Sequence, residues 1–183
     1  MHTTKALLNP APPADEQPRV DNVFRMAEDL IGFVPAAMRL YGISPPLLES
    51  FAGTVGYFRS GTTLSPLLTT TIRYLVSERA SCRFCIDMNE GFLAKLGVDV
   101  DTARAARQDP SLAPVSAREL PLLKLALHAV SEPDADASAL VAEARQAGWS
   151  DREIFDAVLQ AASNRALNLV LKTFNVETQD AFV

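Results

Sequence analysis

The residues best suited to chemistry are two cysteines, Cys82 and Cys85, which stand three positions apart in the segment 81–85. If Cys82 lies in the first turn of a helix, this spacing brings the two thiols within disulfide reach. The dipole at a helix N-terminus favours the thiolate, which is the reactive form, and Arg79 and Arg83 lie close enough in sequence to add positive potential. The pair therefore predicts reversible thiol–disulfide chemistry.

Two other interpretations of the pair stay open. A structural zinc site requires four ligands, whereas the only histidines are His2, near the N-terminus, and His128, within a predicted helix. Cysteine is also common as a small, inert residue of a protein core. The spacing favours redox chemistry without excluding a metal-binding or a purely structural pair.

The composition is typical of a globular protein. Of 183 residues, 48% are hydrophobic and 21% are charged, and the net charge is -5 at pH 7. A negative surface repels phosphate, which argues against a nucleic-acid partner. No stretch approaches the roughly 18 apolar residues needed to span a bilayer, and the N-terminus lacks the apolar core of a secretory signal. We therefore expect a cytoplasmic protein with no membrane partner, where a close cysteine pair is more often catalytic than structural.

The elements that must position the cysteines are predicted to be helices. Ser65 is a candidate N-cap with Pro66 at the first helical position, and Gly97 ends the helix that carries the cysteines. Capping boxes at 116–119 and 150–153 introduce two later helices. No alternating run indicates a strand, so the predicted fold class is all-α. The predicted helices cover residues 21–31, 35–41, 45–59, 66–80, the cysteine segment as far as residue 97, 117–131, 137–147 and 151–174.

The domain organisation predicted from these patterns is simple. Residues 1–20 carry four prolines among small and polar residues, a composition that predicts an extended or disordered N-terminal arm. Such an arm is either a free leader or a segment laid across a neighbouring subunit. Residues 21–183 are predicted to form a single helical domain.

The segment from Leu67 to Gly97 resembles the core motif of the alkylhydroperoxidase D and carboxymuconolactone decarboxylase superfamily, in which a glutamate is followed, after eleven residues, by C-x-x-C-x-x-x-H. Similar segments lie on both sides, at 32–35, 44–48, 148–151 and 164–168. The resemblance covers roughly residues 30–176 and implies a helical bundle that is often assembled as a trimer or hexamer. It also implies that Cys85 is the attacking nucleophile and that Cys82 resolves it as a disulfide.

Two positions depart from the pattern of that family. Asn89 replaces the histidine and Thr70 replaces the glutamate, so the residues that relay protons in the family are absent. Asn89 lies four residues after Cys85, on the same helical face, where its amide can orient a thiolate or water but cannot titrate near pH 7. An ordinary polar position is the alternative interpretation of Asn89.

Glu78 is a candidate substitute for the missing carboxylate because it lies four residues before Cys82. It could accept a proton from an attacking thiol, although its charge would also raise the thiol pKa values. The alternative is an exposed helix charge or a salt-bridge partner.

The resemblance implies a thiol-dependent alkylhydroperoxide reductase or disulfide reductase, an antioxidant oxidoreductase of the peroxidase or peroxiredoxin type. It requires no metal and no organic cofactor. The expected partners are a peroxide or small disulfide as substrate, a dithiol protein as reductant, and further copies of the chain. One alternative is a non-catalytic oligomeric binding or redox-sensing module on the same scaffold. Another is a lactone decarboxylase, although that branch of the superfamily usually lacks the cysteine pair.

Overall fold

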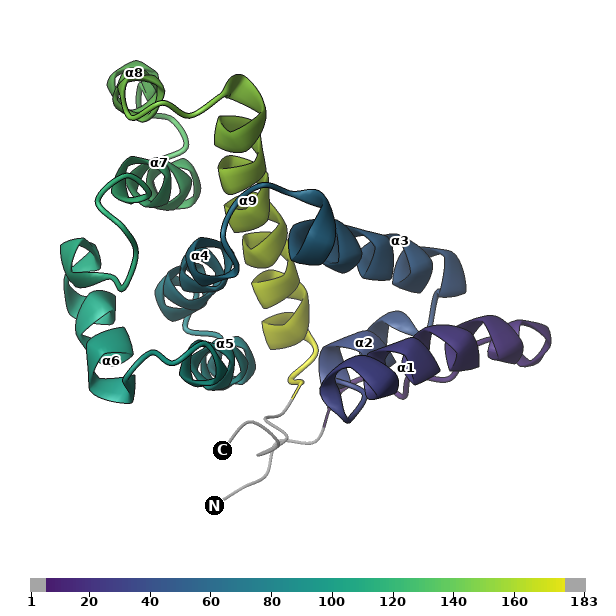
Figure 1. Cartoon of the computed structure of the whole chain (residues 1–183). Helices are drawn as coiled ribbons and strands as arrows, with labels where there is room; N and C mark the ends of the chain where they lie inside the picture. Colours follow the sequence, from purple (N-terminus) through teal and green to yellow (C-terminus); the bar gives the residue numbers. More distant parts are fainter. Residues whose placement is uncertain (1–5, 177–183) are drawn as a thin grey trace. The chain divides into compact units, whose positions relative to one another are not determined.

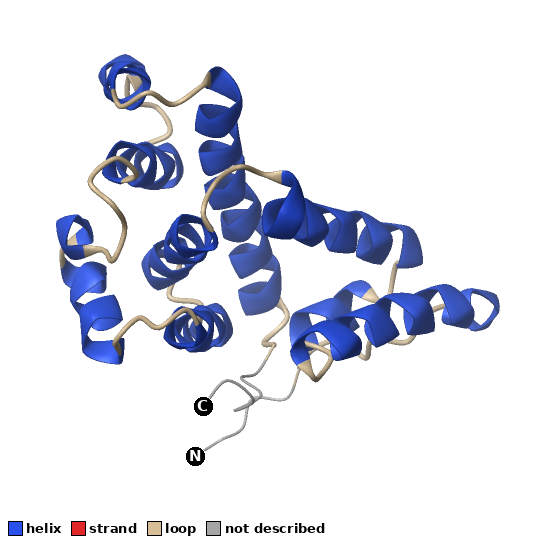
Figure 2. Ribbon diagram, viewed as in Figure 1, coloured by secondary structure: helices blue, strands red, loops and turns tan. Residues whose placement is uncertain are grey.

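The computed structural model describes residues 6–176, and they form helices joined by short loops (Figure 1). Within these residues no strand is present (Figure 2), which confirms the all-α prediction. The α-helices are α1 (Gln17–Ile31), α2 (Ala36–Tyr41), α3 (Pro45–Gly56), α4 (Pro66–Arg79), α5 (Arg83–Lys95), α6 (Val100–Gln108), α7 (Leu120–Ser131), α8 (Ser138–Gln146) and α9 (Asp151–Thr173). Shorter helical turns are η1 (Ala14–Glu16), η2 (Tyr57–Gly61) and η3 (Pro110–Leu112).

Packing divides the described chain into two compact units. The first comprises the residues up to Gly61 together with 171–176, and the second comprises 62–170. The single domain predicted over 21–183 stays a prediction. Residues 1–5 of the predicted arm and residues 177–183 lie outside the described part.

In the first unit, the chain becomes helical earlier than predicted. The turn η1 and the start of α1 occupy residues 14–20, so the predicted arm is wrong over this stretch. Pro18 lies in the first turn of α1, where a missing backbone N–H costs nothing, and therefore it starts the helix rather than preventing it. Arg19 then pairs with Glu49 of α3 at 2.6 Å, and Val20 is buried.

In the second unit, local signals set the helix that leads to the cysteines. The Ser65 hydroxyl accepts a hydrogen bond from the backbone N–H of Leu68 at 3.0 Å, which confirms it as the N-cap of α4. One face of α4 enters the core through Leu68, Ile72 and Leu75. Helix α5 packs closely beside α4, and the second-unit part of α9 lies alongside (Figure 1).

Two boundaries in the second unit differ from the prediction. No helix was predicted over the α6 segment, yet the Asp99 carboxylate caps it by accepting from the Thr102 N–H at 3.0 Å. The capping box between Ser116 and Glu119 forms as predicted, but the α-helix that follows it starts only at Leu120. No helix in residues 6–176 is long and apolar enough to cross a membrane.

Candidate active site

The cysteine pair lies at the sharp link between α4 and α5. Ser81 takes a left-handed conformation with φ of 51°, and the Cys82 N–H donates to the carbonyl of Ser77 at 3.0 Å, closing the end of α4. Cys82 is then the N-cap of α5, because its carbonyl accepts from the Ile86 N–H at 2.9 Å. Cys85 follows in the first turn, so the predicted placement of the two cysteines at a helix N-terminus is confirmed.

The two cysteines form no disulfide, both are buried, and their thiols are in contact with each other. The pKa of the Cys85 thiol is raised well above its ordinary value, first by its hydrogen bond to Cys82, then by burial and by the charge on Cys82. Hydrogen bonds with Asn168 and Ser77 act in the opposite direction and lower it. Ionisation of Cys85 therefore depends on its contact with Cys82.

A network of neutral polar side chains surrounds the Cys85 thiol. Asn164 of α9 donates from Nδ2 to the hydroxyl of Ser77 at 3.0 Å and to the Oδ1 of Asn168 at 3.2 Å. Asn168 also donates to the Ser77 hydroxyl, at 3.3 Å. All three side chains are buried. Since each has a fixed partner, the network holds Ser77 and Asn168 in place against the thiol.

Asn89 is fully buried, and both the nitrogen and the oxygen of its side-chain amide form hydrogen bonds. Its Nδ2 donates to the backbone carbonyl of Cys85 at 2.8 Å, and its Oδ1 accepts from the Nε of Arg73 at 2.9 Å. The contacts that the structure gives Asn89 are thus with the backbone of Cys85 and with a cation, rather than with a thiol. A role in catalysis stays a prediction.

Thr70, which occupies the second position that differs from the family motif, also contacts Arg73. Its hydroxyl accepts from Nη2 of Arg73 at 2.9 Å, while Nη1 donates to Gln160 of α9 at 3.4 Å. Burial lowers the pKa of the Arg73 guanidinium to about 10. The two positions at which the family has a histidine and a glutamate are therefore joined, in this chain, through one arginine.

The charged residues near the pair in sequence have other contacts. Glu78 forms an ion pair with Arg107 of α6 at 2.6 Å, which matches the salt-bridge alternative. Arg79 donates to the carbonyl of Leu127 at 2.9 Å. The side chain of Arg83 is 86% exposed and faces Asp87 at 3.7 Å.

Replacing Glu78 by glutamine is expected to change the thiol reactivity of the pair by less than about twofold, because the Glu78 carboxylate pairs with Arg107 of α6 rather than with a thiol. The measurement is the rate of thiol alkylation at a fixed pH, with the free energy of unfolding as a control. A much larger fall in the alkylation rate would contradict this placement and restore the catalytic interpretation of Glu78.

Several site residues escaped prediction although the sequence carries a signal for them. Four polar residues stand at intervals of four along α9, and all are buried: Asp156, Gln160, Asn164 and Asn168. A polar line on the inward face of a helix is unusual, since buried polar groups must find partners. Ser77 and Arg73 give no comparable signal, because they stand among several other polar residues of α4.

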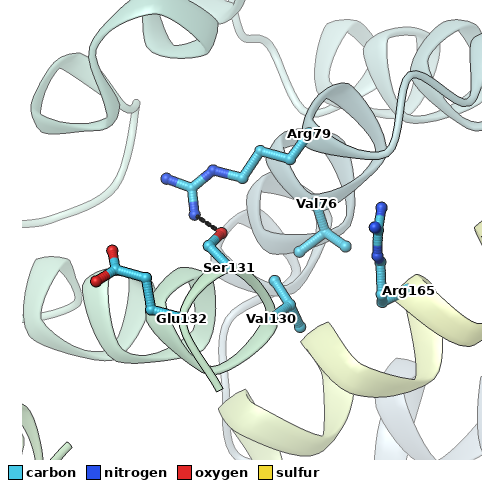
Figure 3. Close-up of a pocket in the computed structure, with 6 residues that line it drawn as sticks. All are labelled: Val76, Arg79, Val130, Ser131, Glu132 and Arg165. Carbon is cyan, nitrogen blue, oxygen red and sulfur yellow. Dashed lines mark hydrogen bonds between the residues drawn. The ribbon is translucent and has the colours of Figure 1, made fainter. Parts of the chain in front are cut away.

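A cavity of about 450 Å³ lies nearby in the second unit, between α4, α7 and α9 (Figure 3). Its lining residues are Val76, Arg79, Val130, Ser131, Glu132 and Arg165. Figure 3 shows Arg79 donating to the hydroxyl of Ser131 across it. None of the predicted site residues lines this cavity. Among residues 6–176, no group of three or more His, Cys, Asp or Glu is placed to hold a metal ion.

Comparison with known proteins finds solved structures of similar fold. No protein-family model matches the chain, and no curated protein sequence matches it. Among solved structures, an uncharacterized peroxidase-related protein from Silicibacter sp. TM1040 is similar with a TM-score of 0.86 and 19% identity, covering 98% of this chain and 94% of that one. An alkylhydroperoxidase AhpD core protein from Ralstonia eutropha JMP134 is similar with a TM-score of 0.83 and 17% identity, covering 97% and 94%.

A third similar structure is a cysteine-to-alanine variant of the debrominase Bmp8 in complex with 2,3,4-tribromopyrrole. Its TM-score is 0.79 at 19% identity, and the match covers 98% of this chain and 95% of that one. The low identities mean that these neighbours show the fold and not the activity. They confirm the resemblance drawn from the cysteine motif: the chain has the fold of alkylhydroperoxidase D-like, peroxidase-related proteins.

Proposed function

We propose that this chain is a thiol-dependent reductase in which Cys82 and Cys85 reduce a peroxide or a small disulfide. The observation that carries the proposal is the direct contact of two reduced thiols at the N-terminus of α5. A helix N-terminus stabilises a thiolate, and a second thiol in contact with it can close a disulfide. The fold of peroxidase-related proteins supports the same chemistry.

The reaction on a peroxide balances with the two thiols alone. A thiolate sulfur attacks one peroxide oxygen, the O–O bond breaks, and the departing alkoxide takes up a proton as the alcohol. The resulting sulfenic acid condenses with the second thiol, forming the disulfide and releasing water. A dithiol reductant then exchanges with the disulfide and returns two electrons and two protons to the pair.

The order of attack between the two thiols stays a prediction. The family resemblance assigns the attack to Cys85 and its resolution to Cys82. In the reduced pair, the hydrogen bond to Cys82 is the largest cause that raises the pKa of Cys85, so this contact opposes formation of the Cys85 thiolate. Trapping the sulfenic acid in single-cysteine variants decides which sulfur attacks.

A second candidate function is reductive dehalogenation, which the similarity to a debrominase favours. Replacing a carbon-bound halogen by hydrogen consumes two electrons and one proton and releases halide. A dithiol that closes to a disulfide supplies those electrons. Both functions use the same pair, and they differ in the substrate that reaches it.

The test is turnover of defined substrates by the purified protein with dithiothreitol as reductant. Consumption of hydrogen peroxide, cumene hydroperoxide or a small disulfide, well above the rate without protein, supports the reductase. Release of bromide from a bromopyrrole, with the other substrates left intact, would replace it by the dehalogenase. Absence of turnover with every substrate, despite a reducible Cys82–Cys85 pair, would favour the non-catalytic module.

A further inference from the structure

Arg73 is an enclosed cation whose partners are all neutral. Its guanidinium donates to Asn89, Thr70 and Gln160, and each of these acceptors is an amide or hydroxyl oxygen. Among residues 6–176, no carboxylate forms an ion pair with Arg73. The lowered pKa has burial as its only cause, with no charge opposing it.

A buried cation that has only neutral partners destabilises the folded protein, so stability does not explain why Arg73 is there. Buried charges in proteins are normally paired, because removing an ion from water is not repaid by hydrogen bonds to neutral groups. Here three separate helices each supply an acceptor, so the guanidinium is held in one position. Three of its five N–H groups are occupied, which leaves two for another acceptor.

Arg73 is linked to Cys85 by hydrogen bonds through Asn89 and Ser77. Asn89, which accepts from Arg73, also donates to the backbone carbonyl of Cys85. Ser77, which contacts the Cys85 thiol, donates to the backbone carbonyl of Arg73 at 2.6 Å. Arg73 thus lies one helical turn before Ser77 on α4, and Ser77 contacts the Cys85 thiol. The residue keeps a minor part of its surface exposed.

We propose that Arg73 binds an anionic group, such as a carboxylate, on the substrate that the Cys82–Cys85 pair reduces. The inference rests on the proposed function, since it names the substrate class of the same site. It also explains the two departures from the family motif. Thr70 and Asn89 supply neutral acceptors that leave the charge of Arg73 free, whereas a glutamate at position 70 would neutralise it.

The test compares two aromatic disulfides that oxidise the pair by the same reaction. Dithiobis(nitrobenzoate) carries two carboxylates, and dithiodipyridine is neutral at pH 7. In each case a thiolate displaces one aromatic thiolate to give a mixed disulfide, and the second cysteine displaces the other and closes the Cys82–Cys85 disulfide. The ratio of the two rate constants cancels differences in thiol pKa and reports the preference for negative charge.

Arg73→Gln is expected to lower this ratio roughly tenfold relative to the parent protein. Arg73→Lys, which keeps the charge, is expected to retain most of the preference. The matched control is Arg83→Gln, which removes an exposed arginine next to Cys82 and is expected to change the ratio by less than twofold. Benzoate should slow only the anionic reagent, and this measurement needs no variant that could fail to fold.

The outcomes separate this inference from the function on which it rests. An unchanged ratio in Arg73→Gln, or benzoate without effect on the parent protein, would overturn the anion site even if both reagents oxidise the pair rapidly. Failure of the neutral reagent to form the Cys82–Cys85 disulfide would instead count against the proposed reductase.

Discussion

Replacing either Cys82 or Cys85 by serine is expected to lower steady-state turnover by more than about 10³-fold, because neither variant can close the disulfide. The rate of peroxide or disulfide reduction with dithiothreitol measures this, and the double variant sets the baseline. The two thiols are in contact at the start of α5, so the substitutions remove the reacting atoms and little of the core. A single variant that keeps a tenth of the parent rate would contradict a two-cysteine mechanism.

The same variants identify the attacking sulfur. Cys82→Ser is expected to trap one equivalent of sulfenic acid on Cys85, the attacking residue that the resemblance implies, detected by mass after reaction with dimedone. In Cys82→Ser, the pKa of Cys85 should fall, because the hydrogen bond and the charge that raise it are gone. The midpoint of Cys85 alkylation against pH then moves to lower pH than in the parent. Sulfenic acid that forms only in Cys85→Ser would assign the attack to Cys82.

The fold could be predicted from local signals wherever those signals are strong. Ser65 followed by Pro66, the glycine at position 97 and the capping box at 150–153 each mark a helix end by a specific hydrogen bond or backbone angle, and the structure forms them. Such features depend on a few neighbouring residues, and therefore the sequence contains nearly all the information that sets them.

Weaker elements could not be predicted in this way. Helix α6 buries little more than Ala103 and Ala106, so its apolar periodicity is too faint to distinguish it from a loop. The early start of α1 depends on Arg19 contacting Glu49, which are thirty residues apart. In both cases tertiary packing adds the stability that local propensity lacks.

The candidate site also combines residues that local sequence predicts with residues that only tertiary packing brings together. The cysteines are neighbours in sequence, so their chemistry could be predicted from spacing alone. The groups that control them come from α4 and α9, separated by more than eighty residues, and meet only in the folded protein. No periodicity reveals that Arg73 lies between Thr70 and Asn89. The replacements Thr70 and Asn89 are visible in the sequence, whereas their shared contact with a buried arginine appears only in the folded protein.

Asn168→Ala is expected to destabilise the protein by roughly 1–3 kcal/mol, because it leaves buried polar groups of Ser77 and Asn164 with fewer partners. It should also raise the pKa of Cys85, since Asn168 donates a hydrogen bond that lowers it. Urea unfolding measures the first effect. Alkylation of Cys85 against pH, in a Cys82→Ser background with a single thiol, measures the second.

Asn164→Ala is the matched control for this experiment. Asn164 belongs to the same buried network and donates to the Arg73 carbonyl at 3.1 Å, but it is not among the groups that shift the Cys85 pKa. Both variants should therefore lose stability, while only Asn168→Ala moves the alkylation midpoint to higher pH. Equal midpoints in the two variants would mean that the network supports the fold without tuning the thiol. A midpoint that moves only in Asn168→Ala would establish that α9 controls the ionisation of a cysteine on α5.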